Sequence, residues 1–406
     1  EPDGCQNERS GDRGRKCADH GRKVIAREPG GNGEKVNDYP QRMMESSNAQ
    51  NRILDRIQLN HMKTNTLSSL MTAVVLAAGA SSARSADLAD TFLVMFKPLP
   101  AEAATPDNDL SEARTDLGRM LYYDRRFSKN QDISCNSCHM LDKYGTDNAA
   151  FSTGHKGQKG GRSAPTVYNA ALHIAQFWDG RAPTVEEQAK GPVLNPIEMA
   201  MPDKEFVIKV IKSIPGYAEA FKKAFPGEAD PINYDNFGKA VGAFERKLLT
   251  PSRWDEYLKG KKDALTPAEQ KGFETFASVG CVTCHNGPAV GGHMYQKLGL
   301  AKPWPDLKDN GRFEATKLEQ DKHFFKVPTL RNITETGPYL HDGSVTKLGD
   351  MVKKMGEHQL GKEITNEQCA SIVTFLKALK GDLPTDYIKE PKLPASGPDT
   401  PKPDPS

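Results

Sequence analysis

Two copies of one short pattern, Cys-x-x-Cys-His, constrain this 406-residue chain more than any other feature. The copies are Cys135-Asn-Ser-Cys138-His139 and Cys281-Val-Thr-Cys284-His285. In this pattern the two thiols add to the vinyl groups of a haem, and the adjacent histidine binds the iron as proximal ligand. A zinc site would need a second ligand pair beside each copy, and a thioredoxin-like redox pair would need a βαβ context. The sequence offers neither, so we expect two covalently bound c-type haems.

The rest of the chain predicts helices. Three segments have the form of an N-terminal capping box, namely Thr184-Val-Glu-Glu187, Thr266-Pro-Ala-Glu269 and Thr365-Asn-Glu-Gln368. After the third, apolar residues recur at helical spacing from Ile372 to Leu379, and Gly381 is placed to end that helix. Alternating strand patterns are scarce. The expected fold class is mainly α, with two cytochrome c-type haem domains in tandem at residues 87–250 and 251–390.

Composition and the remaining cysteines add limits. The formal net charge of +2 favours neither nucleic-acid binding nor attraction to an anionic membrane surface. Cys369 is expected to be a small buried hydrophobe on a helix. Cys5 and Cys17 lie in a polar N-terminal stretch, and we assign them no function.

The two ends of the chain have patterns of their own. Residues 62–86 are expected to be a secretory signal peptide, because a short apolar run at residues 70–80 leads into small residues. That run is too short to span a bilayer, so no membrane span is expected in the mature form. Residues 1–61 are expected to be either an over-extended start, with Met62 as the true initiator, or a disordered extension. Residues 391–406 are Pro-rich and are expected to be disordered or extended.

An internal repeat relates the two halves. Ala164-Pro-Thr-Val-Tyr-Asn169 resembles Val327-Pro-Thr-Leu-Arg-Asn332, and an Asp-Gly pair follows each proline by fourteen residues. The residue before Asp-Gly is Trp178 in the first copy and His341 in the second. Each copy follows its own haem motif, so the chain is expected to contain a duplicated haem domain.

The second axial ligand of each iron decides what each haem can do. A His/Met iron is filled and suits electron transfer, whereas a releasable ligand leaves the iron open to peroxide. After His285, spacing alone leaves seven candidates, which are Met294, Met351, Met355, His293, His323, His341 and His358. After His139, the notable residue is His155, which lies in the glycine-rich stretch 152–161. An exposed loop histidine without function is the alternative there.

From about residue 88 to residue 389 the chain resembles the bacterial di-haem cytochrome c peroxidases. The segments that carry the resemblance, besides the second haem motif, are residues 134–139, 145–147, 154–155, 164–166, 177–182, 191–199, 327–332, 339–343 and 354–356. The resemblance implies reduction of hydrogen peroxide to water, with electrons from a monohaem cytochrome c or a cupredoxin. It also implies export to the periplasm, where c-type haem is attached, and a homodimer.

The resemblance implies that the two haems differ. The N-terminal haem would be the peroxidatic centre, with His139 proximal and His155 a displaceable distal ligand. The C-terminal haem would accept electrons, with His285 proximal and Met355 distal. Met351 lies four residues before Met355, so a helix would place both on one face, and the family pattern selects Met355.

Further site residues are implied in the same way. Glu198 would act as base and then acid on peroxide, and Gln188 would hold the peroxide by hydrogen bonds. Trp178 would lie between the haems and serve electron transfer.

The family also binds calcium between the domains. Thr336 and Pro338 match the carbonyl ligands, but Ser163 stands where the family has Asn. Serine is a shorter oxygen donor, so the side-chain ligand differs.

Two other functions remain open at this point. One is a di-haem electron-transfer cytochrome without peroxidase activity. The other is a di-haem oxidase that matures a protein-derived cofactor, a class that has Tyr at the position of Met355.

Overall fold

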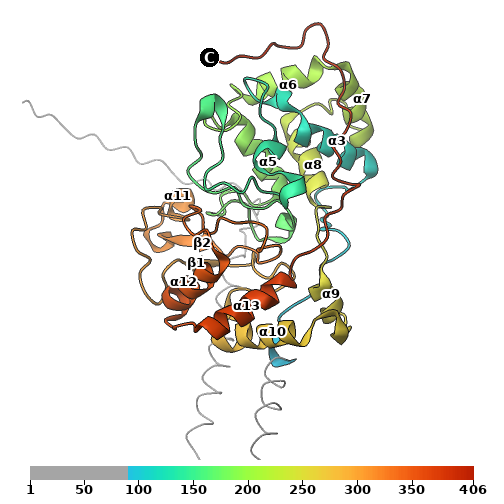
Figure 1. Cartoon of the computed structure of the whole chain (residues 1–406). Coiled ribbons are helices and arrows are strands. Elements are labelled where there is room, and N and C mark those ends of the chain that lie inside the picture. The colour runs from blue at the N-terminus through green and yellow to red at the C-terminus, as the bar shows by residue number, and fades with distance from the viewer. Residues whose placement is uncertain (1–89) are drawn as a thin grey trace, which may run out of the picture. The chain divides into compact units, whose positions relative to one another are not determined.

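The computed structural model describes residues 90–406. The expected upstream extension (1–61) and signal peptide (62–86) lie outside these residues. Most of the regular secondary structure in the described part is helical, which confirms the expected mainly α fold (Figure 1). None of the helices in residues 90–406 has the length and hydropathy that a bilayer crossing requires.

The N-terminal half is built around one apolar core. Its α-helices are α3 (Glu112–Tyr123), α4 (Cys135–Cys138), α5 (Val185–Leu194), α6 (Lys204–Lys212), α7 (Pro215–Ala224) and α8 (Tyr234–Glu245). α8 is central, because α3 and α5 both pack along it. The approach of α3 to α8 requires Gly118, since a Cβ there would lie 1.9 Å from the Ala240 carbonyl oxygen. Leu117, Phe127 and Phe244 are among the side chains that this core buries completely.

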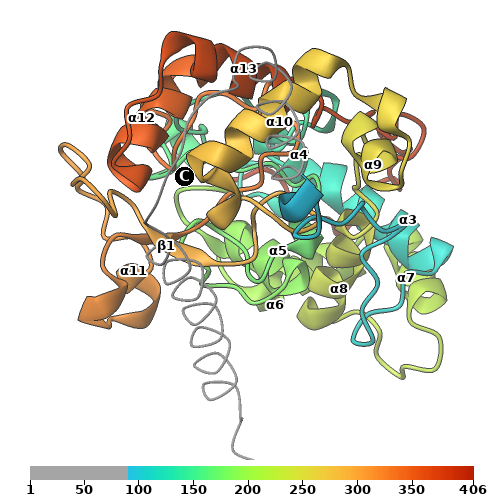
Figure 2. The ribbon, with the colours of Figure 1, turned by 90° about the horizontal axis from the view of Figure 1, so that it is seen from below.

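The C-terminal half has a second core. Its elements are α9 (Arg253–Leu258), α10 (Pro267–Val279), β1 (Tyr295–Lys297), α11 (Phe313–Thr316), β2 (Phe324–Lys326), α12 (Leu348–Leu360) and α13 (Asn366–Lys377). α10 packs along α13, and α12 packs against α13 (Figure 2). The strands form an antiparallel pair in which Tyr295 faces Lys326 and Lys297 faces Phe324. Trp254 and Phe375 lie in the centre of this core.

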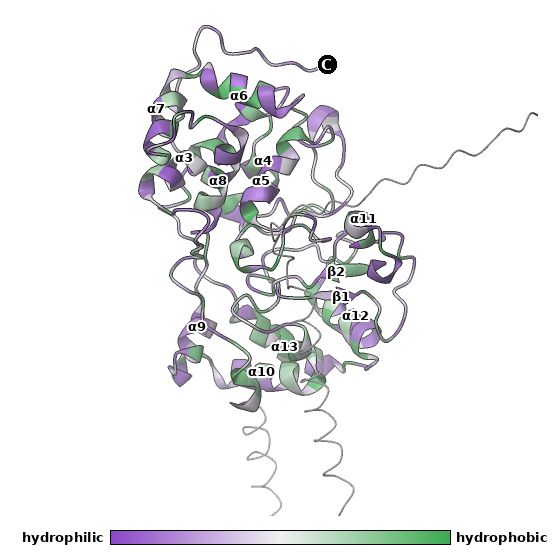
Figure 3. Cartoon of the chain, turned by 180° about the vertical axis from the view of Figure 1, so that it is seen from behind, coloured by the Kyte–Doolittle hydropathy of each residue, from purple (hydrophilic) through white to green (hydrophobic). Residues whose placement is uncertain are grey.

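The helix starts agree with the sequence. Thr266 and Thr365 each form a complete capping box, and the Thr184 hydroxyl accepts a hydrogen bond from the Glu187 main-chain nitrogen. Cys369 is buried on α13, as expected. Figure 3 shows hydrophilic and hydrophobic residues on the same helices, as amphipathic helices around a core require.

The expected end of the last helix at Gly381 is wrong. α13 ends at Lys377, and Ala378 keeps a right-handed conformation, so the helix ends by local hydrogen bonds rather than at a left-handed glycine. The main-chain nitrogen of Gly381 instead donates to the Asn332 side chain at 2.9 Å. Tertiary structure therefore uses this glycine, because a Cβ there would lie 2.1 Å from the Thr250 carbonyl oxygen.

Each core includes a segment from the far end of the chain. Phe96, near the start of the described residues, packs with Trp254 in the C-terminal core at a ring-centroid distance of 5.4 Å. Ile388, near the other end, belongs to the N-terminal core. These crossings fasten the two halves together.

The two copies of the internal repeat meet at one residue. Asn169 and Asn332, the last residues of the two copies, both donate from their side-chain amides to the Thr250 hydroxyl, at 2.9 Å and 2.8 Å. Both adopt left-handed backbone conformations, with φ of 62° and 60°. Thr250 thus lies where the two halves join, and the repeats place their haem motifs in related surroundings.

Candidate haem sites

The first haem motif lies on the short helix α4. Cys135 and Cys138 begin and end this helix, and His139 follows directly. The Tyr122 hydroxyl donates to the His139 main-chain oxygen at 2.7 Å. The ring nitrogen Nδ1 of His139 donates to the Pro165 carbonyl at 3.0 Å. Because Nδ1 carries the proton, Nε2 keeps its lone pair for an iron.

The second motif has a related environment. Cys281 opens a 3₁₀ turn (Cys281–Thr283) directly after α10, and the main-chain nitrogen of His285 donates to the Cys281 oxygen at 3.0 Å. Burial lowers the pKa of His285 to about 4, against a smaller opposing effect of the Val290 and Pro328 carbonyls. Pro328 is the repeat equivalent of Pro165, so each repeat places a proline carbonyl beside its own proximal histidine.

The four motif thiols fit thioether attachment better than zinc. Burial raises the pKa of Cys138 to about 11 and that of Cys281 to about 12, and it also raises the pKa of Cys135 and Cys284. Thiols of this kind stay protonated at neutral pH, whereas zinc binds thiolates. In residues 90–406 no group of three or more His, Cys, Asp or Glu side chains is placed to hold a metal ion.

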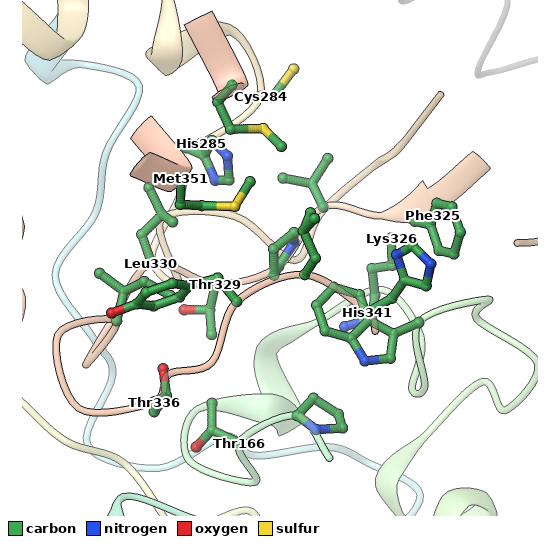
Figure 4. Close-up of a pocket in the computed structure, with 18 of the residues that line it drawn as sticks. Thr166, Cys284, His285, Phe325, Lys326, Thr329, Leu330, Thr336, His341 and Met351 are labelled. Carbon is green, nitrogen blue, oxygen red and sulfur yellow. The ribbon is translucent and has the colours of Figure 1, made fainter. Parts of the chain in front are cut away.

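A cavity of about 250 Å³ lies beside the second motif (Figure 4). It is lined by Cys281, Cys284 and His285, and on the opposite side by both Met351 and Met355 of α12. Figure 4 shows the Met351 thioether next to the His285 ring. The two methionines are one helical turn apart, so the choice of Met355 as the iron ligand stays a prediction.

The cavity narrows the other distal candidates. Of the seven, only Met351, Met355 and His341 line it. His323 and His358 use their Nδ1 atoms on main-chain oxygens elsewhere, at 3.0 Å and 3.2 Å. His341 is stacked on Phe325 with ring centroids 4.3 Å apart, in the wall of the cavity.

The residues that distinguish the two repeats face each other. Trp178 and His341, which occupy equivalent repeat positions, meet edge to face with ring centroids 6.3 Å apart. The Trp178 indole donates to the Ser163 carbonyl at 2.9 Å, and Trp178 lines the cavity of the second motif. A residue of the first half therefore forms part of the second haem site, as a role between the haems requires.

A charged network beside Trp178 was not expected from the sequence. Arg162 pairs with Asp179 and with Asp309, each at 2.7 Å, and these two carboxylates come from different halves of the chain. The His341 ring lies 3.7 Å from Asp309. The network holds Trp178 and His341 in one arrangement.

A buried cation in the cavity wall fits a haem. Lys326 is buried, and no carboxylate in residues 90–406 forms an ion pair with it; its Nζ lies 3.0 Å from Nδ1 of His173. Burial lowers the pKa of Lys326 to about 8, and Nε2 of His173 is buried without a hydrogen-bond partner. Buried charges need a counter-charge, and a haem propionate would supply one. Lys326 occupies the repeat position of Ser163, and that difference was the sequence signal for it.

The distal side of the first motif is a tight loop. The main-chain nitrogen of His155 donates to the Glu198 main-chain oxygen at 2.8 Å, and the His155 side chain is buried. Gly154 permits this approach, because a Cβ there would lie 2.0 Å from the Ile197 carbonyl oxygen. Nε2 of His155 lies 3.3 Å from the main-chain oxygen of Ser406.

The Glu198 carboxylate faces the first motif. Burial raises the pKa of Glu198, while the charge of Arg181 and a hydrogen bond from Asn195 at 3.0 Å partly oppose that rise. Its charge contributes to the raised pKa of Cys138, which locates the carboxylate on the haem side. Gln188 lies on α5, and its side chain makes no hydrogen bond within the described residues, so the structure does not bring it to Glu198.

The residues expected to hold calcium lie together. Ser163, Thr336 and Pro338 all line the cavity of the second motif. The carbonyls of Thr336 and Pro338 accept no hydrogen bond within residues 90–406, so both are uncommitted donors of the kind calcium takes. The Ser163 hydroxyl donates to the Ala149 carbonyl at 3.3 Å, and its carbonyl already accepts from Trp178. Serine is therefore the weak member of this set.

Comparisons with known proteins agree on one family. The family model described as di-haem cytochrome c peroxidase matches residues 112–263. The cytochrome c551 peroxidase of Nitrosomonas europaea is 48% identical over 309 residues, which are 75% of this chain and 90% of the relative. That of Pseudomonas aeruginosa is 42% identical over 323 residues, 78% and 92% of the two chains. Among solved structures, a MauG-like protein associated with microbial copper homeostasis matches with a TM-score of 0.65 and 28% identity, covering 73% of this chain and 97% of that one.

Proposed function

The chain belongs to the family of bacterial di-haem cytochrome c peroxidases, and on this premise we propose that it reduces hydrogen peroxide to water. The family implies two covalently bound haem c groups. Each peroxide takes up two electrons and two protons and gives two water molecules. A small soluble redox protein, a monohaem cytochrome c or a cupredoxin, delivers the electrons singly near the C-terminal haem. The site of action is the periplasm, and the protein acts as a homodimer.

The two sites have different tasks. When bound, haem supplies an iron that takes peroxide at one centre and relays electrons at the other. His139 and the releasable His155 serve the peroxidatic N-terminal haem, while His285 and Met355 hold the C-terminal one. Nδ1 of His139 is committed to the Pro165 carbonyl, so the proximal ring keeps its orientation whatever happens on the distal side.

Glu198 moves the proton. Its carboxylate takes a proton from the near oxygen of peroxide and returns it to the far oxygen, which leaves as water. The raised pKa caused by burial suits this exchange, because it brings the carboxylate closer to working pH. Asn195 orients the carboxylate, and Gln188 binds the peroxide.

One observation carries the proposal. The loop of His155 is fastened to Glu198 by a main-chain hydrogen bond of 2.8 Å. The residue that must leave the iron and the residue that must act on peroxide thus share one local structure. A plain electron-transfer cytochrome has no use for this arrangement.

The remaining residues connect the centres. Trp178 bonded to Ser163 and packed on His341 supports its role in electron transfer between the haems. Calcium bound by Thr336 and Pro338, with Ser163 nearby, would stabilise the same junction.

A cofactor-maturing oxidase is the rival enzyme. The MauG-like solved structure shows that this branch shares the fold's likeness. That class has Tyr at the position of Met355, whereas α12 here places two thioethers, Met351 and Met355, at the cavity. Methionine favours a stable electron-entry haem, and so the peroxidase reading is preferred.

Replacing His155 tests the proposal. The fully oxidised His155→Gly enzyme should react with peroxide in every molecule, whereas oxidised wild type should react only in the fraction whose His155 is off the iron. Lys156→Gly is the matched control, because Lys156 lies on the same loop with φ of 56°, which glycine accepts. An oxidised His155→Gly enzyme that does not react with peroxide would refute the proposed role of His155.

A further inference from the structure

The C-terminal segment of residues 391–406 crosses the N-terminal half. It contains no helix or strand, and it runs past α7 and α6 (Figure 1). A Cβ on Gly216, at the start of α7, would lie 2.6 Å from the Pro394 side chain. The Thr400 hydroxyl donates to the Ser213 main-chain oxygen at 3.2 Å, at the junction of α6 and α7. The segment is therefore held along its path.

Its last residues contact the strand of chain that precedes the first haem motif. The Gln131 side chain donates to the Pro401 carbonyl at 2.8 Å, and the Asp404 main-chain nitrogen donates to the Lys129 oxygen at 2.9 Å. Nζ of Lys129 lies 3.6 Å from the Asp404 carboxylate and donates to the Ser406 main-chain oxygen at 2.8 Å. Lys129 and Gln131 thus fix the end of the segment beside the site.

The same end reaches the distal histidine. Nε2 of His155 lies 3.3 Å from the Ser406 main-chain oxygen. A carbonyl can only accept, so this ring nitrogen must carry a proton when the contact forms. A protonated ring nitrogen has no lone pair for an iron, so this contact and iron ligation exclude each other at Nε2.

There is room for the loop to move. A cavity of about 370 Å³ is lined by Asn130 and Ile133 on one side, by residues 153–157 on another, and by Pro405. The loop that carries His155 and the end of the C-terminal segment are therefore neighbours of one open space.

We propose that residues 401–406 position the distal loop of the N-terminal haem by capturing His155 when it is off the iron. The inference rests on the proposed function, in which His155 is a releasable ligand. Capture gives Nε2 a second partner, which shifts the equilibrium away from the ligated state. Lys129 and Gln131 are positioning residues, because they act through the segment and not on the haem.

Deleting residues 401–406 from the holoenzyme tests this. The ratio of low-spin, six-coordinate to high-spin N-terminal haem in the oxidised enzyme, measured by absorption and electron paramagnetic resonance, should rise about tenfold. Hydrogen exchange in residues 153–157 should slow, because the loop is then held at the iron. An unchanged ratio, or a fall in it, would overturn the proposal.

Point variants keep the test independent of the deletion. Lys129→Ala combined with Gln131→Ala should raise the low-spin fraction as the deletion does, and Lys129→Arg should restore the wild-type spectrum because it keeps the charge. Asp399→Asn is the control, since Asp399 is exposed and makes no interaction within residues 90–406. A control that changes the spectrum as much as the double variant would overturn the positioning role.

Peroxide turnover separates this inference from the proposed function. After one-electron reduction, the wild type and the deletion variant should reduce peroxide at equal rates. If neither does, the proposed function fails. If both do while the spectra are identical, only the capture by residues 401–406 fails.

Discussion

Replacing Glu198 with glutamine separates its chemical role from its structural one. The structure gives the carboxylate one side-chain hydrogen bond, from Asn195 to Oε1 at 3.0 Å. A glutamine has an oxygen in the same place and accepts that bond, so Glu198→Gln should cost less than about 1 kcal/mol of folding free energy. The variant cannot take a proton, however, so the acid–base function is lost entirely.

The expected loss of rate is much larger than the loss of stability. A positioned acid–base group contributes roughly 10²–10⁴-fold, or about 2.7–5.4 kcal/mol of transition-state stabilisation. We therefore expect kcat/KM for peroxide to fall by at least about a hundredfold in Glu198→Gln. The assay is steady-state turnover with a reduced donor after one-electron activation, alongside denaturant unfolding of the same sample.

The pH profile gives a second readout. Burial raises the pKa of Glu198 above its usual value of 4.5, so the base form is lost as pH falls through a value above 4.5. Wild-type kcat/KM should decline on that acid side, and the decline should be absent in Glu198→Gln.

Glu187→Gln is the matched control for this variant. Glu187 lies on α5, and its carboxylate is half exposed in a surface pair with Lys190 at 2.7 Å. Its replacement should change kcat/KM less than about twofold, since surface pairs contribute little. The reasoning about Glu198 is refuted if Glu198→Gln keeps more than about a tenth of wild-type kcat/KM and the same acid limb.

Three further predictions follow from buried groups. Burial raises the pKa of Glu245 to about 8, so the folded protein holds a proton that the unfolded chain releases above about 4.5; stability should therefore fall as pH rises from about 5 to about 8, by up to about 1.4 kcal/mol per unit. Glu245→Gln should flatten that slope in urea unfolding, and an unchanged slope would contradict the assignment. Met355→Ala should abolish the methionine-to-iron charge-transfer band of the oxidised C-terminal haem and lower its potential, whereas Met351→Ala should keep the band; the reverse result would assign Met351. Ser163→Asn should tighten calcium retention at least about tenfold in a chelator titration, because it adds a longer oxygen donor, and equal retention would place calcium elsewhere.

Features encoded in short stretches of sequence were predictable. The haem motifs, the helix starts at Thr266 and Thr365, and the burial of Cys369 depend on neighbours within a few residues. Local hydrogen bonding and helical periodicity determine such features, so the printed sequence contains all that they need.

Features set by distant contacts were not predictable in this way. Gly381 was expected to end α13, but its place is determined by Thr250 and Asn332, both distant in sequence. The sequence could not show that Phe96 joins the C-terminal core, or that Ile388 joins the N-terminal one. No local pattern records such packing.

The candidate site is divided in the same manner. The repeat pointed to Trp178 and His341 as unlike partners, and the structure brings them into contact. The buried charge of Lys326 and the bridge of Arg162 between two carboxylates depend on tertiary burial, which residue type alone does not give. The choice between Met351 and Met355 stays with the family resemblance, because both line the cavity.

A stepwise reductive titration tests the central claim, that two similar motifs hold haems with unlike tasks. Absorption and electron paramagnetic resonance spectra are recorded as electrons are added to the oxidised protein. The account predicts that the first electron reduces a His/Met haem, served by His285, and that the haem served by His139 then loses its six-coordinate fraction and becomes reactive to peroxide. Two haems that reduce together and both stay six-coordinate, with no reaction with peroxide at any stage, would contradict it.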